Sequence, residues 1–107
     1  MKTIAEFVLP GHPDKLCDRI ADKIVDEACR RDPLSLVGVE VALHQQIVFV
    51  TGCVTTSPPM TENDIVEIVQ ESFRDAGYGE IWSPHPNEVQ VSQDLRLETL
   101  DDDLRQL

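Results

Sequence analysis

The chain contains 107 residues, with nine Lys and Arg against 20 Asp and Glu, so its formal net charge at neutral pH is −11. This balance excludes a general nucleic-acid surface and an anionic-membrane surface, because both require clustered Lys and Arg. The length suits one ordinary domain, and 41% hydrophobic with 27% charged residues is typical of a globular chain. One domain of this size leaves little room for a complete multi-substrate active site.

The pattern of apolar residues and cysteines further limits the class of protein to which the chain can belong. No stretch approaches the roughly 18 consecutive apolar residues of a membrane span, and the N-terminus lacks the apolar segment of a secretory signal. Cys17, Cys29 and Cys53 form neither a disulfide framework nor paired zinc ligands. They are typical of small hydrophobic residues in a reducing compartment. We therefore expect a cytoplasmic protein with no nucleic-acid partner and no membrane partner.

The first predicted elements are a strand and a long helix. Residues 4–9 form a short apolar run that reads as a strand and ends at Pro10 and Gly11. From 13 to 31 apolar residues recur at three- and four-residue steps, which predicts an amphipathic helix that Asp32 and Pro33 terminate. Its polar face carries Lys15, Arg19 and Lys23, each three residues before an Asp, which predicts exposed ion pairs along the helix.

Residues 36–43 and 47–56 alternate in the manner of two half-buried strands. If Gln45 and Gln46 form a two-residue turn, Leu43 pairs with Val48, Val41 with Val50 and Val39 with Gly52. This register gathers the valines on one face, beneath the helices. The opposite face then holds Gly38, Glu40, Ala42, Phe49, Thr51 and Cys53.

A second helix follows the hairpin. Thr61 predicts its N-cap, Asp64 the capping-box partner, and Met60 with Ile65 a hydrophobic staple, while Gly77 ends the helix. Residues 78–87 read as an ordered loop, and residues 88–97 alternate again as a strand. The stretch 99–107 resembles the start of a further helix, and we expect from it that the polypeptide is cut from something longer.

The predicted order is therefore β-α-β-β-α-β in a single domain over residues 1–107. We expect an α+β, two-layer architecture in which two helices pack on one face of a mainly antiparallel sheet. No predicted element covers the other face, which carries an acid, a thiol and small residues. Such a face is typical of a surface that meets another domain, a subunit or a ligand.

The most unusual local sequence is Gly11-His12-Pro13-Asp14-Lys15, which places an imidazole, a carboxylate and an ammonium group around one helix N-terminus. Free N–H groups there favour a phosphate, Lys15 adds positive charge, and Asp14 is of the type that ligates Mg²⁺. The same residues also fit ordinary helix capping, so residue types alone leave both interpretations open. Glu40, in mid-strand, is equally open between a solvent-facing acid and a cation ligand.

A run of motifs in the same order resembles the N-terminal segment of the S-adenosylmethionine synthetase (methionine adenosyltransferase) family. The motifs are Glu6, then Gly-His-Pro-Asp-Lys-Leu-Cys-Asp-Arg-Ile-Ala-Asp at 11–22, Arg-Asp-Pro at 31–33, Val-Gly-Val-Glu at 37–40, Val-Thr-Gly-Cys-Val-Thr-Thr at 50–56 and Phe-Arg-Asp-Ala-Gly-Tyr at 73–78. The similarity runs from about residue 5 to 78 and more loosely to about 95.

This resemblance implies a transferase of one-carbon metabolism that forms S-adenosylmethionine from ATP and methionine. In that reaction the methionine sulfur attacks the ribose C5′, and the triphosphate leaves and is cleaved to phosphate and pyrophosphate, with Mg²⁺ and K⁺ as cofactors. The resemblance assigns a catalytic role to His12 at the leaving group, nucleotide and phosphate binding to Glu6, His12 and Lys15, Mg²⁺ to Asp14, K⁺ to Glu40, and methionine binding to the positions of Cys53 and Gln93.

The chain departs from the family in two motifs and in extent. The family usually has a methionine-binding Glu where this chain has Cys53, and a Ser-rich segment ending in Glu where this chain reads Phe-Val-Leu-Pro at 7–10. Family members are about three times longer, are built from three similar domains and work as dimers with sites between subunits. We therefore expect partners in further synthetase domains or a second subunit, as a homo-oligomer, and an inactive bare chain. The alternative is a catalytically silent binding module that associates with a complete subunit through its exposed sheet face.

Overall fold

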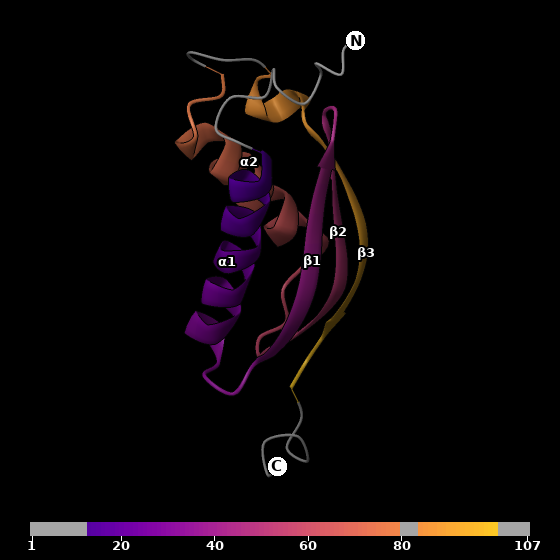
Figure 1. The fold of residues 1–107 in the computed structure, drawn as a ribbon. Helices are drawn as coiled ribbons and strands as arrows, with labels where there is room; N and C mark the ends of the chain where they lie inside the picture. Colours follow the sequence, from indigo (N-terminus) through magenta and orange to yellow (C-terminus); the bar gives the residue numbers. More distant parts are fainter. Residues whose placement is uncertain (1–12, 80–83, 101–107) are drawn as a thin grey trace.

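The computed structural model describes residues 13–79 and 84–100, which form two layers. The elements run in the order α1 (Pro13–Arg31), β1 (Leu36–His44), β2 (Ile47–Thr55), α2 (Glu62–Asp75), the short 3₁₀ helix η2 (Pro86–Glu88) and β3 (Gln90–Glu98). Figure 1 shows α1 and α2 against one face of the sheet, with no described element over the other face. The predicted α+β architecture is thereby confirmed. The strand expected at 4–9 and most of the helix expected at 99–107 lie outside the described residues.

The helix α1 has the predicted bounds because apolar residues on one side of it enter the core. Leu16, Ile20, Ile24 and Ala28 are each at most 3% exposed. At its C-terminal end, the carboxylate of Asp32 accepts a hydrogen bond from the Leu34 backbone at 3.0 Å. The end of α1 is also tied to the sheet, since the Thr56 hydroxyl donates to the Ala28 carbonyl at 2.9 Å.

The helix α2 begins as its sequence predicts. The Thr61 hydroxyl accepts a hydrogen bond from the Asp64 backbone at 3.1 Å, and the Asp64 carboxylate accepts one from the Thr61 backbone at 2.8 Å. These two bonds satisfy N–H groups that a helix start leaves without an internal partner. Met60 and Ile65, the predicted staple residues, are both buried.

The hairpin register is also as predicted. Leu43 pairs with Val48, Val41 with Val50 and Val39 with Gly52. Gln45 accommodates the tight turn with a φ of 57°. The valines of β2 consequently face the helices, and Val48, Val50 and Val54 are fully buried.

The described sheet is mixed, with the order β1-β2-β3. Strands β1 and β2 pair antiparallel, whereas β2 and β3 pair parallel, so the expectation of a mainly antiparallel sheet describes only the hairpin. The physical reason is the connection, because α2 returns the chain along the sheet and β3 then starts from the same end as β2. Alternation of apolar residues predicts that a strand exists but not its direction.

Candidate functional site

The first candidate group lies at the N-terminus of α1, where Asp14 and Lys15 occupy the first turn and are exposed. Both point away from the core because Leu16 and Ile20 hold the opposite side of the helix against the sheet. Burial, followed by the negative charges of Asp14 and Asp18, raises the pKa of the Cys17 thiol above its ordinary value. The helix dipole is positive here, so this end can attract an anion.

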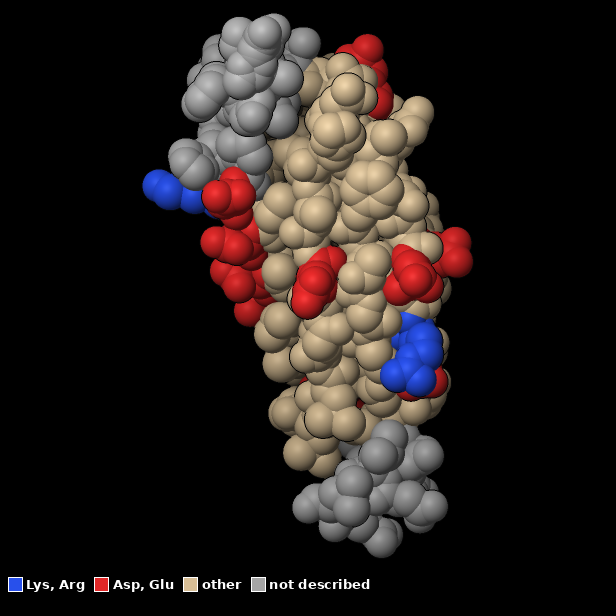
Figure 2. All heavy atoms as spheres, turned by 45° about the vertical axis from the view of Figure 1, so that its right-hand side comes forward, with Lys and Arg blue, Asp and Glu red and all other residues tan. Residues whose placement is uncertain are grey.

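The second candidate group lies on the sheet face that no described helix covers, hereafter the open face. Glu40, Thr51 and Asp94 are neighbours across the three strands, and Gly38, Cys53 and Arg96 form the adjacent row. Figure 2 shows the middle of this side of the molecule as largely uncharged, with separate acidic side chains near its centre and a basic side chain below them on the right. Leu36 and Phe49, large apolar residues of this face, are 54% and 39% exposed.

Cys53 belongs to a small polar cluster at one end of the open face. Its thiol donates to the Glu98 carboxylate at 3.6 Å and lies 3.5 Å from the Thr55 hydroxyl. The Thr55 hydroxyl also donates to Glu98, at 3.5 Å and to the same Oε1 atom. Sequence reasoning singled out Cys53 but missed Glu98, because 45 residues separate the two and only the parallel pairing of β2 and β3 joins them.

Gln93 lies on the opposite side of the sheet from Cys53. It pairs with Val50 and therefore faces the helices, where its Nε2 donates to the Glu62 carbonyl at 3.0 Å. Its Oε1 is buried and, within the described part of the chain, has no hydrogen-bond partner. The two residues that the resemblance places at the methionine thus occupy different faces.

The candidate residues do not converge on one point of the described chain. Asp14 lies 14 residues before Ala28, a distance of about 21 Å along a helix axis. The Thr56 hydroxyl binds the Ala28 carbonyl, so Cys53 lies near the other end of α1. Figure 1 shows the same arrangement, with the start of α1 near the hairpin tip and the ends of β2 and β3 at the far end of the domain. Glu6 and His12 lie outside the described residues.

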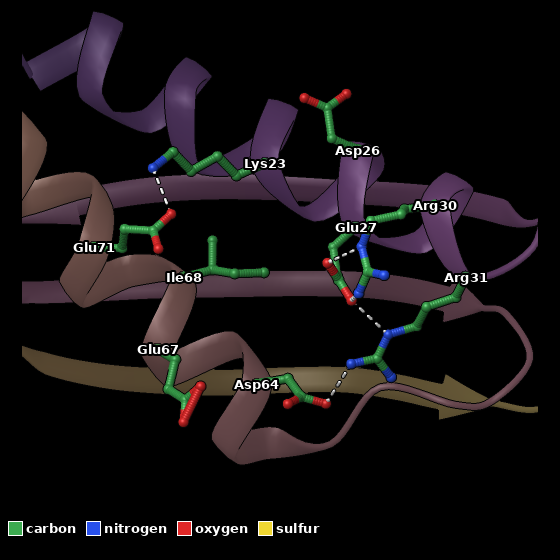
Figure 3. Close-up of a pocket in the computed structure, with 9 residues that line it drawn as sticks. All are labelled: Lys23, Asp26, Glu27, Arg30, Arg31, Asp64, Glu67, Ile68 and Glu71. Carbon is green, nitrogen blue, oxygen red and sulfur yellow. Dashed lines mark hydrogen bonds and ion pairs between the residues drawn. The ribbon is translucent and has the colours of Figure 1, made fainter.

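A groove between α1 and α2, with a volume of about 470 Å³, is lined mainly by charged side chains. Figure 3 shows Lys23 and Arg31 of α1 pairing with carboxylates of α2 across it. Lys23 binds Glu71 at 2.8 Å and Asp75 at 2.6 Å, and Arg31 binds Asp64 at 3.1 Å. The expected pairing of Lys23 within α1 is wrong, because α2 packs alongside and offers two carboxylates at shorter reach. Exposed pairs of this kind contribute only about 0–1 kcal/mol each, and they join the two helices without indicating a ligand.

Comparison with known proteins tests the family resemblance that the sequence motifs indicate. The family model described as the S-adenosylmethionine synthetase N-terminal domain matches residues 1–98. The chain belongs to this family. The S-adenosylmethionine synthase of Gloeobacter violaceus is 40% identical over 76 residues, which cover 71% of this chain and 17% of that protein. The synthase of Trichodesmium erythraeum is 38% identical over 74 residues, covering 69% and 17% respectively.

A solved structure agrees with the family membership. The S-adenosylmethionine synthetase of Campylobacter jejuni, described as unusual, superposes with a TM-score of 0.75 at 30% identity, over 88% of this chain and 26% of that one. The chain therefore spans only a minor part of the length of its synthetase relatives.

The residues of this synthetase domain can be tested for their fit to metal ions. Within 13–79 and 84–100, no group of three or more His, Cys, Asp or Glu is arranged to hold a metal. Asp14 and Glu40 are nevertheless exposed carboxylates, the oxygen donors that hard cations prefer. Mg²⁺ in nucleotide sites takes one or two protein carboxylates and completes its shell with phosphate and water, so a single Asp14 fits that mode.

Among the described residues, no helix is both long and apolar enough to cross a membrane. The described cysteines are all free thiols, as their spacing predicts. Neither observation adds a candidate site among the described residues.

Proposed function

We propose that this chain is the N-terminal domain of an enzyme that forms S-adenosylmethionine from ATP and methionine, with release of phosphate and pyrophosphate. The observation that carries the proposal is the Gly-His-Pro-Asp-Lys motif at 11–15, which leads into α1 within a segment that the family model matches. The synthetase relatives share the fold as well as the sequence, since the Campylobacter structure superposes over 88% of the chain.

In this proposal the first turn of α1 holds the triphosphate. The positive end of the helix and the Lys15 ammonium attract the phosphate oxygens, and His12 donates a hydrogen bond to the leaving group. The Asp14 carboxylate would supply one oxygen ligand to Mg²⁺, which would neutralise phosphate charge, and the Glu40 carboxylate would be a ligand of K⁺. The sulfur lone pair forms a bond to C5′ while the C5′–O bond breaks and its electron pair leaves with the triphosphate, so stabilising that polyanion matters more than proton transfer.

The bare 107-residue chain is expected to be inactive. Asp14 and Cys53 lie toward opposite ends of α1 and in different layers, so one copy does not surround a single ligand with both. This separation supports a site completed by further synthetase domains or by a second subunit. ATP and methionine would be its substrates and the cytoplasm its location.

The test is a titration of the isotope-labelled chain with triphosphate and Mg²⁺, read by amide chemical shifts. We expect shifts at Asp14 and Lys15 that Asp14→Asn weakens severalfold. Asp18→Asn, an exposed acid one turn later on α1, is the matched control and should leave the response unchanged. Unmoved amides at Asp14 and Lys15 would contradict the phosphate site. Methionine-dependent triphosphate release by the bare chain would contradict its inactivity.

A second candidate function is a catalytically silent module that associates with a complete synthetase subunit. The open face favours it, because Leu36 and Phe49 expose apolar surface there and no described element covers them. Size-exclusion chromatography of the chain, alone and mixed with a full-length relative, distinguishes the two. No association under either condition would sink this second candidate.

A further inference from the structure

Strand β3 lies at the edge of the described sheet, and one side of it has no neighbour. The order β1-β2-β3 leaves the side of β3 that faces away from β2, hereafter the free edge, without a described strand. Figure 1 shows β3 as the outermost of the three strands, with no described element beyond it. The strand has nine residues, against about five or six for an average strand, and it contains no Pro, Gly or Lys. It therefore lacks several of the devices by which proteins prevent edge-to-edge pairing.

The free edge presents unpaired backbone groups at every second residue. The Glu98 carbonyl accepts a hydrogen bond from the Thr56 N–H at 3.1 Å, and the register with β2 is regular along β3, so its even-numbered residues bond toward β2. Because the backbone groups of successive strand residues point to opposite sides, those of Gln93, Leu95 and Leu97 point to the free edge. Within the described part of the chain, they have no backbone partner there.

The exposed side chains of β3 carry charges of both signs. Asp94 and Arg96 are exposed on the open face, and neither forms an ion pair with a described residue. If two copies of β3 pair antiparallel about Leu95, each Asp94 lies opposite the Arg96 of the other copy, and this pair occurs twice. The odd-numbered residues then supply the hydrogen bonds. The charged pairs fall at the positions between those bonds, where opposite side chains approach most closely.

The charges favour this register over the neighbouring ones. A ladder centred on Asp94 would set Asp94 opposite its own copy, and one centred on Arg96 would set Arg96 opposite Arg96 and Asp94 opposite Glu98. Like charges directly opposite each other are destabilising. The other edge strand, β1, offers no such selection, because Glu40 is the only Asp, Glu, Lys or Arg in it.

We propose that two copies of this chain pair through β3, in a two-fold dimer whose sheet continues from one copy into the other. This contact uses the free edge and not the open face, and it does not depend on the proposed function. A two-fold axis at Leu95 gives both copies the same contacts, so the assembly closes as a dimer. The contact of one strand with another is small, so we expect a weak dimer that dissociates on dilution.

The experiment is sedimentation equilibrium of the 107-residue chain over a concentration series, in about 0.15 M salt to screen the net charge. We expect a monomer–dimer equilibrium. Arg96→Asp replaces both opposite-charge pairs by like-charge pairs and should raise the dissociation constant about tenfold or more. Arg19→Asp makes the same change of charge at an exposed position of α1 and should leave the dissociation constant unchanged.

A second charge variant separates register-specific pairing from a loss of folding. Asp94→Arg alone should weaken the dimer as Arg96→Asp does, because Arg then lies opposite Arg. A mixture of the two variants should form a heterodimer to within a few-fold of the starting affinity, since every opposite pair then joins one Arg and one Asp. The absence of a heterodimer in this mixture would overturn the proposal.

Amide hydrogen exchange distinguishes edge pairing from contact between two open faces. The N–H groups of Gln93, Leu95 and Leu97 should exchange severalfold more slowly in the dimer than in the Arg96→Asp variant. Contact through the open faces would leave them exposed to water, and the proposal would then be wrong. It is also wrong if these groups are protected in a monomer, because another segment of the same chain then covers the free edge. A chain that stays monomeric up to about 1 mM would contradict it as well.

Discussion

The two faces of the sheet differ although the same three strands make both. On the helix-covered face, Val48, Val50 and Val54 of β2 are fully buried against α1 and α2. On the open face, the alternate residues of the same strand include an exposed Phe49 and the half-buried Cys53. Because successive side chains of a strand point to opposite faces, one strand can supply packing on one side and chemistry on the other. Stability should therefore depend more on the side chains of the covered face than on those of the open face.

The largest expected effect comes from Gly52 in β2, which lies against the backbone of Gly38 and Val39 in β1. A Cβ on Gly52 would overlap the Gly38 carbonyl oxygen, and the φ of 126° disfavours any L side chain. Gly52→Ala should lower the free energy of unfolding by about 3 kcal/mol or more, since backbone strain adds to the overlap. Urea unfolding followed by circular dichroism measures it.

The matched control for Gly52 is Gly38, the other glycine of the hairpin, which pairs with Cys53. A Cβ added to Gly38 has open space around it, with nothing within 4 Å. Gly38→Ala should change the free energy of unfolding by no more than about 1 kcal/mol. If the two variants lose similar amounts of unfolding free energy, the contact between Gly52 and the Gly38 backbone is not what makes a side chain at position 52 destabilising.

The second largest effect is expected when Val50 on the covered face is compared with its neighbour Phe49 on the open face. Val50→Ala removes two buried methyl groups from the covered face and should cost about 2–3 kcal/mol, from lost burial and the cavity left behind. Phe49→Ala removes a larger side chain from the open face, yet it should cost less, because that side chain is already 39% exposed. Thermal and urea unfolding of the two variants give the ratio. A larger loss for Phe49→Ala would mean that something covers the open face in solution.

Sequence periodicity was sufficient where the interactions are local. The bounds of α1, the capping box of Thr61 and Asp64, and the hairpin register all follow from spacings of a few residues. The parallel pairing of β3 did not follow, because alternation carries no information about strand direction. Long-range contacts were also missed. The pairing of Lys23 with Asp75 depends on how α1 and α2 pack, which the spacing of residues within one helix does not show.

The candidate site residues show the same difference between local features, which motifs predict, and long-range contacts, which they do not. Asp14, Glu40 and Cys53 could be selected from motifs, and the structure places Glu40 and Cys53 on one face, as the register predicts. Gln93 could not be placed correctly by motif alone, because its face depends on the register of β3 against β2. Glu98 carried no local signal at all. Only the parallel pairing of β2 and β3 brings it beside Cys53 and Thr55.

A smaller loss of stability is expected from the N-cap of α2, one of the two helices that cover the sheet. Thr61→Ala removes the hydroxyl that accepts from the Asp64 backbone and should cost about 1 kcal/mol of folding free energy. Asn63→Ala is the control, because Asn63 is exposed and its amide contacts only Glu67. Urea midpoints at constant slope report both. If the two variants are equally destabilised, the capping box does not contribute measurably to α2.

The smallest effect concerns the ion pair between the two helices and its dependence on pH. The hydrogen bond from Lys23 lowers the pKa of Asp75 below its ordinary 3.8. Burial opposes the charged form of Lys23, but its hydrogen bonds to Asp75 and Glu71 outweigh burial and raise the pKa of Lys23 above 10.5. A carboxyl whose folded pKa is lowered stabilises the fold above its unfolded pKa, and that contribution disappears as the pH falls through the folded value. The raised pKa of Lys23 adds stability below 10.5 that is lost as the pH rises through its folded value. The pair therefore acts between these two limits.

Lys23→Met should accordingly cost about 0.2–1 kcal/mol at neutral pH, because Asp75 is 49% exposed and water screens the pair. The difference from the starting chain should begin to shrink as the pH falls below 3.8, the ordinary pKa of Asp75, and should vanish once the pH is below the lowered folded pKa, where Asp75 is protonated in both chains. Lys15→Met, on the same helix but without an ion pair among the described residues, should show no such pH-dependent difference. A difference that persists undiminished at pH 2 would mean that Lys23 stabilises the helix layer through the packing of its methylene groups against α2, and the covered face would then hold its helices without electrostatic help.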